Sequence, residues 1–349
     1  MAQILTYSEI DRQQWSELVR TSETGTWFQS PEAYDFYASL PELMDPFVYG
    51  LERAGKLCAV CVGYVTKERS AIKQFFTRRA IIIGGPCLAN DCVNEEVKLL
   101  LSTLNFQLST GSNAPIYIET RNFNDYTPWR HAFEMAGKSE NCHPRRRPLL
   151  PFHRKDAPGF AYKPHLNFHV DPSVNNLSDN RKRQLKKSDA TTELAVSEQE
   201  IREWYKVLAE LYRTKVKTPL WPIEFFLEAY RQGIAKFLLV MHEGRIIGGS
   251  MVVSDERTAY EWFECGLNAQ YKDQYPSVMA TYAGIQLAKQ TGCTRYDMMG
   301  AGEPGVPYGV RDFKAEFGGQ LVEHGRFLCV TKPLLYKIGT IGIKFLKHR

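Results

Sequence analysis

The 349-residue sequence lacks the features that mark several classes of protein. No uninterrupted apolar run approaches the roughly 20 residues that a membrane-spanning helix needs. The first residues, MAQILTYSEIDRQQW, have no basic start followed by an apolar core, so we expect no signal peptide. Histidines, cysteines and acids do not recur at the spacing of a metal site. These absences predict a cytoplasmic protein without a bound metal.

The eight cysteines lie mostly inside apolar segments. Cys58 and Cys61 have C-x-x-C spacing within LCAVCVGYV, but strand alternation predicts that they point to opposite faces. No second cysteine pair accompanies them, so we expect buried reduced thiols rather than a zinc or redox site. His165 and His169 share one face of the predicted strand HLNFHVD. Without a carboxylate at ligand spacing, we expect them to pack in the strand or lie on the surface.

Size and composition are those of an ordinary globular protein with more than one core. A content of 44% hydrophobic and 24% charged residues is typical of soluble domains, and 349 residues exceed the usual size of one domain. The net charge of +5 is unevenly distributed. The basic excess is concentrated in residues 145–147, residues 181–187 and residues 332–349.

The order of predicted elements repeats between the two halves. Each half reads as helix, helix with a nearby tryptophan, hairpin, strand, long helix, strand and short helix. Trp27 and Trp221 occupy matching places, as do the hairpin turns at residues 55–56 and 244–245. This duplication predicts an α+β protein of two tandem domains, each with a mixed central sheet flanked by helices.

The expected boundaries follow from this repeat. The first domain covers residues 1–144, and residues 145–164, rich in proline and basic residues, form a linker. The second domain covers residues 165–331, and residues 332–349 form a basic C-terminal helix.

The stretch YGVRDFKAEFGG, residues 308–319, follows an irregular loop with three glycines and two prolines. Asp312 is a predicted helix cap, and a glycine pair ends the short helix. Lys314 stands between Phe313 and Phe317, which indicates a substrate-binding site. The alternative is a surface lysine on a capping turn.

Two domains with this element order resemble tandem GNAT acyltransferase domains, as in the FemAB family of aminoacyltransferases that build peptidoglycan cross-bridges. The resemblance rests on an ordered block within residues 271–323. Its members are Tyr275-Pro276, then residues 292–297 (GCTRYD), then Phe313-Lys314 and residues 317–323 (FGGQLVE).

The resemblance implies an activity and a site. The lysine of the family's F-K-x-x-F-G-G motif lies at the acceptor and acyl-transfer site, which implies Lys314 with Phe313 beside it. Further substrate contacts are expected from Arg213, Lys217 and Tyr260 of the second domain. The implied reaction moves an aminoacyl group from aminoacyl-tRNA to an amine of a soluble or lipid-linked peptidoglycan precursor.

Two departures affect the expected donor. The long coiled-coil arm of staphylococcal-type members, a candidate tRNA-docking site, is reduced here to a short basic helix near residues 180–189. The coenzyme A phosphate loop of GNAT enzymes has no counterpart at residues 274–280, where glycine is absent and Pro276 removes a donor, nor at residues 84–88. We therefore expect no tightly bound cofactor and an aminoacyl-tRNA donor.

Two other functions stay open at this point. The first is a coenzyme A-dependent N-acyltransferase acting on a sugar, lipid or peptide amine. The second is a non-catalytic protein that binds cell-wall or membrane precursors with the duplicated fold.

Acyl transfer to an amine suggests roles for the polar residues near the motif. Lys314 can stabilise the oxyanion or hold an acceptor phosphate, or act as a base if burial lowers its pKa. Asp297 can orient the amine or act as a base; a capping role is the alternative. Tyr260, Trp262 and Glu264 alternate along one predicted strand and so should share a face, either substrate-binding or solvated.

Two basic segments predict contacts with phosphates. The first, around a short helix, is expected to bind tRNA phosphates or anionic lipid headgroups, with a solvated helix as the alternative. Its cations are Arg181, Lys182, Arg183, Lys186 and Lys187. The C-terminal segment predicts a basic amphipathic helix on the inner membrane face, or else a helix packed on the second domain. Its apolar face comprises Leu334, Ile338, Ile341 and Phe345.

Overall fold

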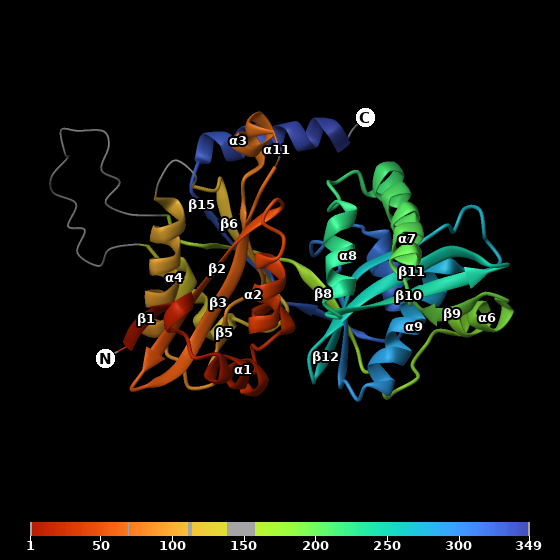
Figure 1. Ribbon diagram of the computed structural model, residues 1–349, viewed down its shortest axis with the longest axis horizontal. Coiled ribbons are helices and arrows are strands. Elements are labelled where there is room, and N and C mark those ends of the chain that lie inside the picture. The colour runs from red at the N-terminus through yellow and green to blue at the C-terminus, as the bar shows by residue number, and fades with distance from the viewer. Residues whose placement is uncertain (1, 69, 111–113, 138–157, 348–349) are drawn as a thin grey trace. The chain divides into compact units, whose positions relative to one another are not determined.

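The computed structural model describes residues 2–68, 70–110, 114–137 and 158–347 (Figure 1). The chain forms two compact units. The first consists of Met1–Pro164 together with His324–Arg349, and the second is His165–Glu323. Both units are mixed sheets with helices on their faces, which confirms the predicted α+β class with two domains.

The first unit is built on an eight-stranded mixed sheet. Strands β4 (Ala80–Gly84) and β6 (Tyr117–Asn122) pair in parallel, next to the hairpin of β2 (Met44–Arg53) and β3 (Lys56–Thr66). The other neighbouring strands are antiparallel. The order is β1 (Ala2–Thr6), β2 (Met44–Arg53), β3 (Lys56–Thr66), β4 (Ala80–Gly84), β6 (Tyr117–Asn122), β15 (Arg326–Val330) and β7 (Ala161–Lys163), with β5 (Cys87–Leu88) beside β3.

Helices cover this sheet because their apolar positions recur with helical spacing. In the longest, Val97, Leu100, Leu101 and Leu104 are fully buried against the sheet. The helices of this unit are α1 (Arg12–Thr21), α2 (Pro31–Ala38), α3 (Ala71–Thr77), α4 (Asn94–Ser109), α5 (Arg130–Met135) and α11 (Pro333–Lys347).

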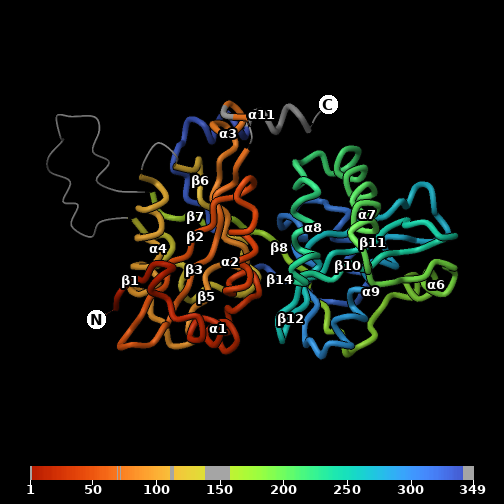
Figure 2. Tube along the Cα trace, viewed as in Figure 1, coloured from red at the N-terminus to blue at the C-terminus, as the bar shows by residue number. Residues whose placement is uncertain are grey.

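The second unit has a seven-stranded sheet with one parallel pair, β12 with β13. Its order is β14 (Gln320–Glu323), β8 (Leu166–Val170), β13 (Arg295–Gly300), β12 (Thr258–Gly266), β11 (Arg245–Ser254), β10 (Ala235–His242) and β9 (Thr191–Leu194). Helices α7 and α8 cover one face of this sheet, and α9 covers the other (Figures 1 and 2). The helices are α6 (Asp179–Lys187), α7 (Glu198–Leu211), α8 (Ile223–Arg231), α9 (Pro276–Gln290) and α10 (Gly309–Ala315).

The two units repeat one connection. In the first, α4 joins the parallel strands β4 and β6; in the second, α9 joins β12 and β13. Each parallel pair follows an antiparallel hairpin, β2–β3 or β10–β11. Parallel neighbouring strands must be joined by a crossover connection, and in each unit the long helix forms that connection.

The predicted domain boundaries need correction at the C-terminal side. Strand β15 pairs with β6 and β7 of the first sheet, so the second unit ends at Glu323 and not at residue 331. Of the expected linker, residues 145–157 lie outside the described residues, while Ala161–Lys163 is a strand of the first sheet. Helix α11 also belongs to the first unit, where the Tyr336 ring packs on Tyr117 with centroids 5.6 Å apart.

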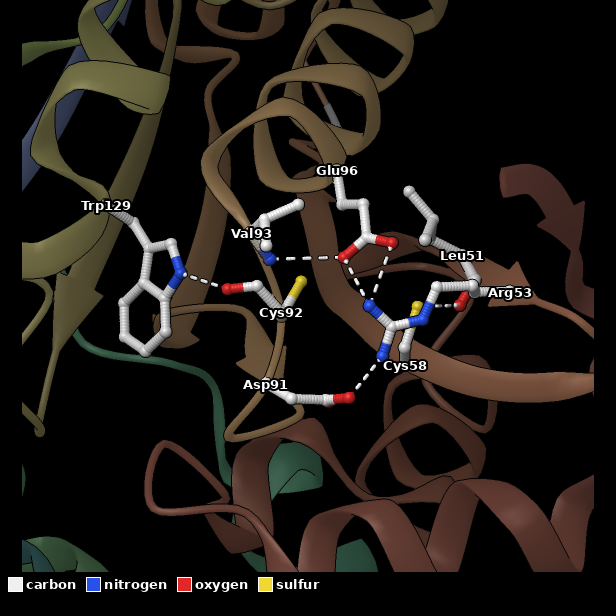
Figure 3. A network of polar contacts seen from close by, with 8 residues as sticks. All are labelled: Leu51, Arg53, Cys58, Asp91, Cys92, Val93, Glu96 and Trp129. Carbon is white, nitrogen blue, oxygen red and sulfur yellow. Dashed lines mark hydrogen bonds and ion pairs between the residues drawn. The ribbon is translucent and has the colours of Figure 1, made fainter. Parts of the chain in front are cut away.

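A charged network fixes the start of α4 in the first unit (Figure 3). An amino group of Arg53 donates to a carboxylate oxygen of Glu96 at 3.2 Å, and another pairs with Asp91. The Glu96 carboxylate also accepts the Val93 amide at 3.1 Å, which satisfies one of the free donors at the helix start. Glu96 thus links the helix N-terminus to the β2 strand.

The same region corrects the prediction for the cysteine pair. A β-bulge lies at Cys58, since Leu51 pairs with Ala59 while Glu52 pairs with Leu57. Strand alternation is therefore broken, and Cys58 and Cys61 pack in one core cluster instead of on opposite faces. The Cys58 thiol donates to the Leu51 carbonyl oxygen at 3.2 Å (Figure 3). Every cysteine in the described part of the chain is free and buried.

Candidate functional site

The F-K-x-x-F-G-G stretch forms the short helix α10 and the turn after it. The helix begins after Tyr308, so Asp312 lies in its first turn and is not the N-cap. Arg311 braces the preceding loop by donating to the carbonyl oxygens of Ala301 at 2.9 Å and Glu303 at 2.6 Å. Gly318 has a φ of +78°, and a Cβ there would lie 2.1 Å from a backbone oxygen, so the turn requires glycine.

Lys314 is buried beneath α10, which excludes the alternative of a surface lysine. Its side chain is 8% exposed, and its amine donates to the carbonyl oxygen of Gly300 at 2.8 Å and to that of Met298. Both acceptors lie at the end of β13. Strands β12 and β13 pair only as far as Tyr260, which lies opposite Asp297. The Lys314 amine therefore donates to β13 residues that lie beyond this last pair.

Two glutamates of β12 share the face that α9 covers. Val252 pairs with Glu261 and Met251 with Phe263, so Trp262 occupies a β-bulge. The extra residue brings Glu261 and Glu264, three positions apart, to the same side of the sheet. The sequence analysis missed Glu261, because a bulge inside an apolar strand leaves no clear sequence signal.

Glu261 is buried and hydrogen-bonded. The Tyr296 hydroxyl donates to its Oε1 at 3.0 Å. Gly284 of α9 leaves the space that the phenol needs, since a Cβ there would lie 2.1 Å from the Tyr296 oxygen. Burial raises the pKa of Glu261, and the Lys314 charge and the hydroxyls of Thr281 and Tyr296 oppose this shift.

Glu264 has the most strongly raised carboxyl pKa of this group. Burial and then the neighbouring Glu261 carboxylate raise the pKa of Glu264 to about 8, against the opposing effects of Ser277, Lys314 and Lys215. Its Oε1 is shielded from solvent and has no hydrogen-bond partner among the described residues. A carboxyl group with these properties can exchange a proton near neutral pH.

The lysine and the carboxyl groups are electrostatically coupled. Burial lowers the pKa of Lys314, and the charges of Glu261, Asp297 and Glu264 oppose that shift in this order. We call Glu261, Glu264, Asp297, Tyr296 and Lys314 the buried cluster. It combines a cation, three acids and a phenol at the point where β12 and β13 stop pairing.

Asp297 is held by strand β8 and by its own backbone. It faces His169 in the β13–β8 register, with its Oδ2 3.1 Å from the His169 Nε2. Its Oδ1 accepts the Met299 amide at 2.7 Å, where Met299 has a φ of +63°. Burial opposes ionisation, but His169, Arg295 and the Met299 amide outweigh it and lower the pKa of Asp297. His169, predicted to pack in the strand or lie on the surface, is therefore a partner of Asp297.

The predicted common face of Tyr260, Trp262 and Glu264 is wrong, because the bulge at Trp262 breaks the alternation. Tyr260 is fully buried, and its hydroxyl donates to Asp255 at 3.2 Å. The Trp262 ring packs on Phe225 of α8, with centroids 5.2 Å apart. Only Glu264 of the three joins the buried cluster.

Arg213 and Lys217 lie in a π-helical turn, Tyr212–Val216 and its C-cap, and both are exposed. Arg213 pairs with Glu210 at 2.7 Å, a helix-surface ion pair. The structure does not bring either cation into the buried cluster. Lys215 of the same turn, which was not selected from the sequence, lowers the pKa of Glu264 after Lys314 does.

Arg181 is buried and packs against α10, so its charge is not on the surface. Its guanidinium lies 4.5 Å from the centre of the Phe313 ring and 5.2 Å from that of Phe317. It also donates to the Phe313 carbonyl oxygen at 3.2 Å and lies 3.6 Å from Glu316. The prediction of a phosphate contact thus fails for Arg181, which is 5% exposed. The other four cations of α6 are exposed: Lys182, Arg183, Lys186 and Lys187.

Comparisons with known proteins agree with this fold. Residues 174–314, which include the whole buried cluster, match the model of the acetyltransferase (GNAT) domain. A search of curated protein sequences finds no match. Among solved structures, FemX is similar at a TM-score of 0.68, with 13% identity over 96% of this chain and 99% of FemX.

Two other solved structures cover nearly the whole chain. A tandem GNAT protein from the clavulanic acid biosynthesis pathway has 9% identity and a TM-score of 0.56 over 95% of this chain and 99% of its own. L-PGS from Bacillus licheniformis has 11% identity and a TM-score of 0.52, with 97% of each chain covered. At these identities the likeness establishes the fold. The chain therefore has the fold of two tandem GNAT-like domains, similar to that of FemX.

Proposed function

We propose that this protein is an acyltransferase that transfers an acyl group to an amine at the buried cluster of its second unit. One observation carries the proposal: Lys314 and Glu264 are coupled in a buried site where β12 and β13 stop pairing. The GNAT domain match, which contains the cluster, supports this class of reaction.

Glu264 acts in this proposal as the general base. An amine nucleophile must lose a proton as it attacks, and a base with a pKa near the working pH is best suited to accept it. The unpartnered Oε1 of Glu264 has an unused acceptor position, and its pKa is about 8. The amine nitrogen bonds the acyl carbon, and the ester C–O bond breaks. The proton passes to Glu264 and then to the leaving oxygen.

Lys314, which the resemblance implies at the acyl-transfer site, acts in this proposal as the cation that stabilises the oxyanion. Two of its three N–H groups have backbone acceptors in β13, which fix the amine; the third has no acceptor within the described part of the chain. A fixed donor in a water-excluded site stabilises developing negative charge more than a mobile one. Asp297 orients this end of β13 through His169 and Met299 and does not need to exchange a proton.

We infer that the donor is an aminoacyl-tRNA and the acceptor an amine of a peptidoglycan precursor. The likeness to FemX supports this choice. The start of α9 argues against a phosphate-binding loop for coenzyme A. Pro276 has no N–H, and the Ser277 amide already donates to the Asn268 side chain at 3.2 Å. Fewer free donors remain there for a pyrophosphate, which supports aminoacyl-tRNA over coenzyme A as the donor.

A mass-shift assay tests the donor. The purified protein is incubated with a muropeptide precursor and either charged tRNA or acetyl-coenzyme A. The proposal predicts an aminoacyl mass shift with charged tRNA only. An acetyl shift with coenzyme A would instead identify the alternative, an N-acyltransferase acting on a sugar, lipid or peptide amine. Precursor binding without any shift would support a non-catalytic binding protein.

A further inference from the structure

Helices α3 and α11 of the first unit lie against each other (Figure 1). Both carry large apolar side chains that are exposed. On α3, Ile72 is 75% exposed, Phe75 57% and Phe76 48%. On α11, Leu334 is 77% exposed and Ile338 57%. We call these five residues the α3–α11 face. Exposed apolar side chains that gather on adjacent helices mark an interaction surface.

Both helices are attached to the sheet by their other side. On α11, Tyr336 packs on Tyr117 of β6, while Leu334 and Ile338, spaced one turn apart, point outward. On α3, the Gln74 side chain donates to the Thr66 carbonyl oxygen of β3 at 3.0 Å. The exposed apolar residues therefore belong to anchored helices, which present them to solvent.

Helices α3 and α11 themselves carry charge of one sign, although the exposed Glu68 precedes α3 and Asp45 lies 4.0 Å from Arg78. Neither α3 nor α11 contains an aspartate or glutamate. Lys73 and Lys337 are exposed on the same helices, and Lys332 precedes α11. Burial and the nearby charge of Arg78 lower the pKa of Lys332, so positive charges are close together here. Apolar side chains beside lysines match the boundary between anionic headgroups and acyl chains.

We propose that the α3–α11 face docks the protein on an anionic membrane surface. Its helices would lie in the interface, with their phenylalanine, leucine and isoleucine side chains inserted below the headgroups and their lysines among the lipid phosphates. Among the described residues, no helix is both long and apolar enough to cross a bilayer. The attachment is thus peripheral. The face belongs to the first unit and involves no residue of the buried cluster.

Vesicle flotation of the full chain tests this proposal. We expect binding to phosphatidylglycerol-containing vesicles, weaker binding to pure phosphatidylcholine, and weakening by salt. Phe75→Ser with Phe76→Ser, or Leu334→Ser with Ile338→Ser, should each abolish flotation. Lys73→Gln with Lys337→Gln should lower binding about 25-fold, since each lysine near an anionic surface contributes about fivefold. Phe106→Ser is the matched control, because Phe106 of α4 is 62% exposed outside this face.

A second measurement does not depend on the serine variants folding. In Phe75→Trp, tryptophan fluorescence should be quenched by brominated anionic lipids more than in the unchanged protein. The proposal is overturned if the protein does not float with anionic vesicles, or if the serine variants float like the unchanged protein. It is also overturned if the face instead mediates concentration-dependent self-association that the same serine variants remove.

Discussion

Glu261 and Glu264 lie on the same face of the second sheet although they are three positions apart on one strand. The β-bulge at Trp262 makes this possible. Burial raises the pKa of both carboxyls, and the charge of Glu261 raises that of Glu264 further. Lys314 supplies the opposing charge. An ordinary strand would have placed one glutamate under α9 and the other under α7 and α8, and the cluster would not exist.

The raised pKa of Glu264 predicts how stability depends on pH. The folded state keeps the Glu264 proton up to about pH 8, whereas an unfolded glutamate releases it near pH 4.5. Between these values the folded state binds more protons, so this group makes the free energy of unfolding fall as pH rises. Denaturant unfolding at pH 5 and pH 8 should show a smaller decrease in Glu264→Gln than in the unchanged protein. An identical pH dependence would show that Glu264 titrates normally.

Lys314→Met should destabilise the protein by about 3–5 kcal/mol, because it leaves buried carboxyls without their cation. It also leaves the Met298 and Gly300 carbonyl oxygens without their donor. Adding Glu261→Gln should recover part of this loss, because it removes one uncompensated acid. Denaturant unfolding of both single variants and the double variant measures the coupling. Strictly additive losses would contradict an interaction between Lys314 and Glu261.

Gly284→Ala should lower the free energy of unfolding by about 1–3 kcal/mol, since the new methyl group collides with the Tyr296 hydroxyl. The displaced phenol would no longer donate to Glu261. Gly309→Ala on α10 is the control, because nothing lies within 4 Å of its added Cβ. That variant should be neutral or slightly stabilising. Equal effects of the two substitutions on thermal unfolding would contradict the packing described for α9.

The cations of α6 should separate into two groups. Arg181→Gln should cost about 2 kcal/mol of stability, because it removes a desolvated cation from Phe313 and Phe317. Lys186→Gln, on the exposed side, should leave stability unchanged but weaken tRNA binding and reduce its salt slope by about one. Filter binding at several salt concentrations measures this slope. A salt-independent affinity would instead assign the exposed cations to a solvated surface.

Much of the fold was predictable, because hydrophobic period and turn residues encode it locally. The duplicated order of elements and the position of Lys314 behind β13 followed from such signals. The return of β15 to the first sheet was not predictable, since β15 pairs with strands far away in the sequence. The sequence of an apolar strand does not indicate which sheet the strand joins.

The candidate site was predicted less completely than the fold. Lys314, Asp297 and Glu264 were selected from the sequence, and all three lie in the buried cluster. Glu261 was missed and Tyr260 misplaced on the Glu264 face, both because of the bulge at Trp262. The burial of Arg181 depends on rings more than 130 positions away along the chain.

The most direct test of the proposed chemistry is the rate of aminoacyl transfer by Glu264→Gln as a function of pH. The unchanged protein should gain rate as pH rises toward 8, because only the ionised carboxylate accepts the amine proton. Glu264→Gln should lose about 10²–10⁴-fold in kcat and this pH dependence, while the exposed control Glu256→Gln keeps both. A Glu264→Gln variant with an unchanged rate and pH profile would contradict the assignment of Glu264 as the base.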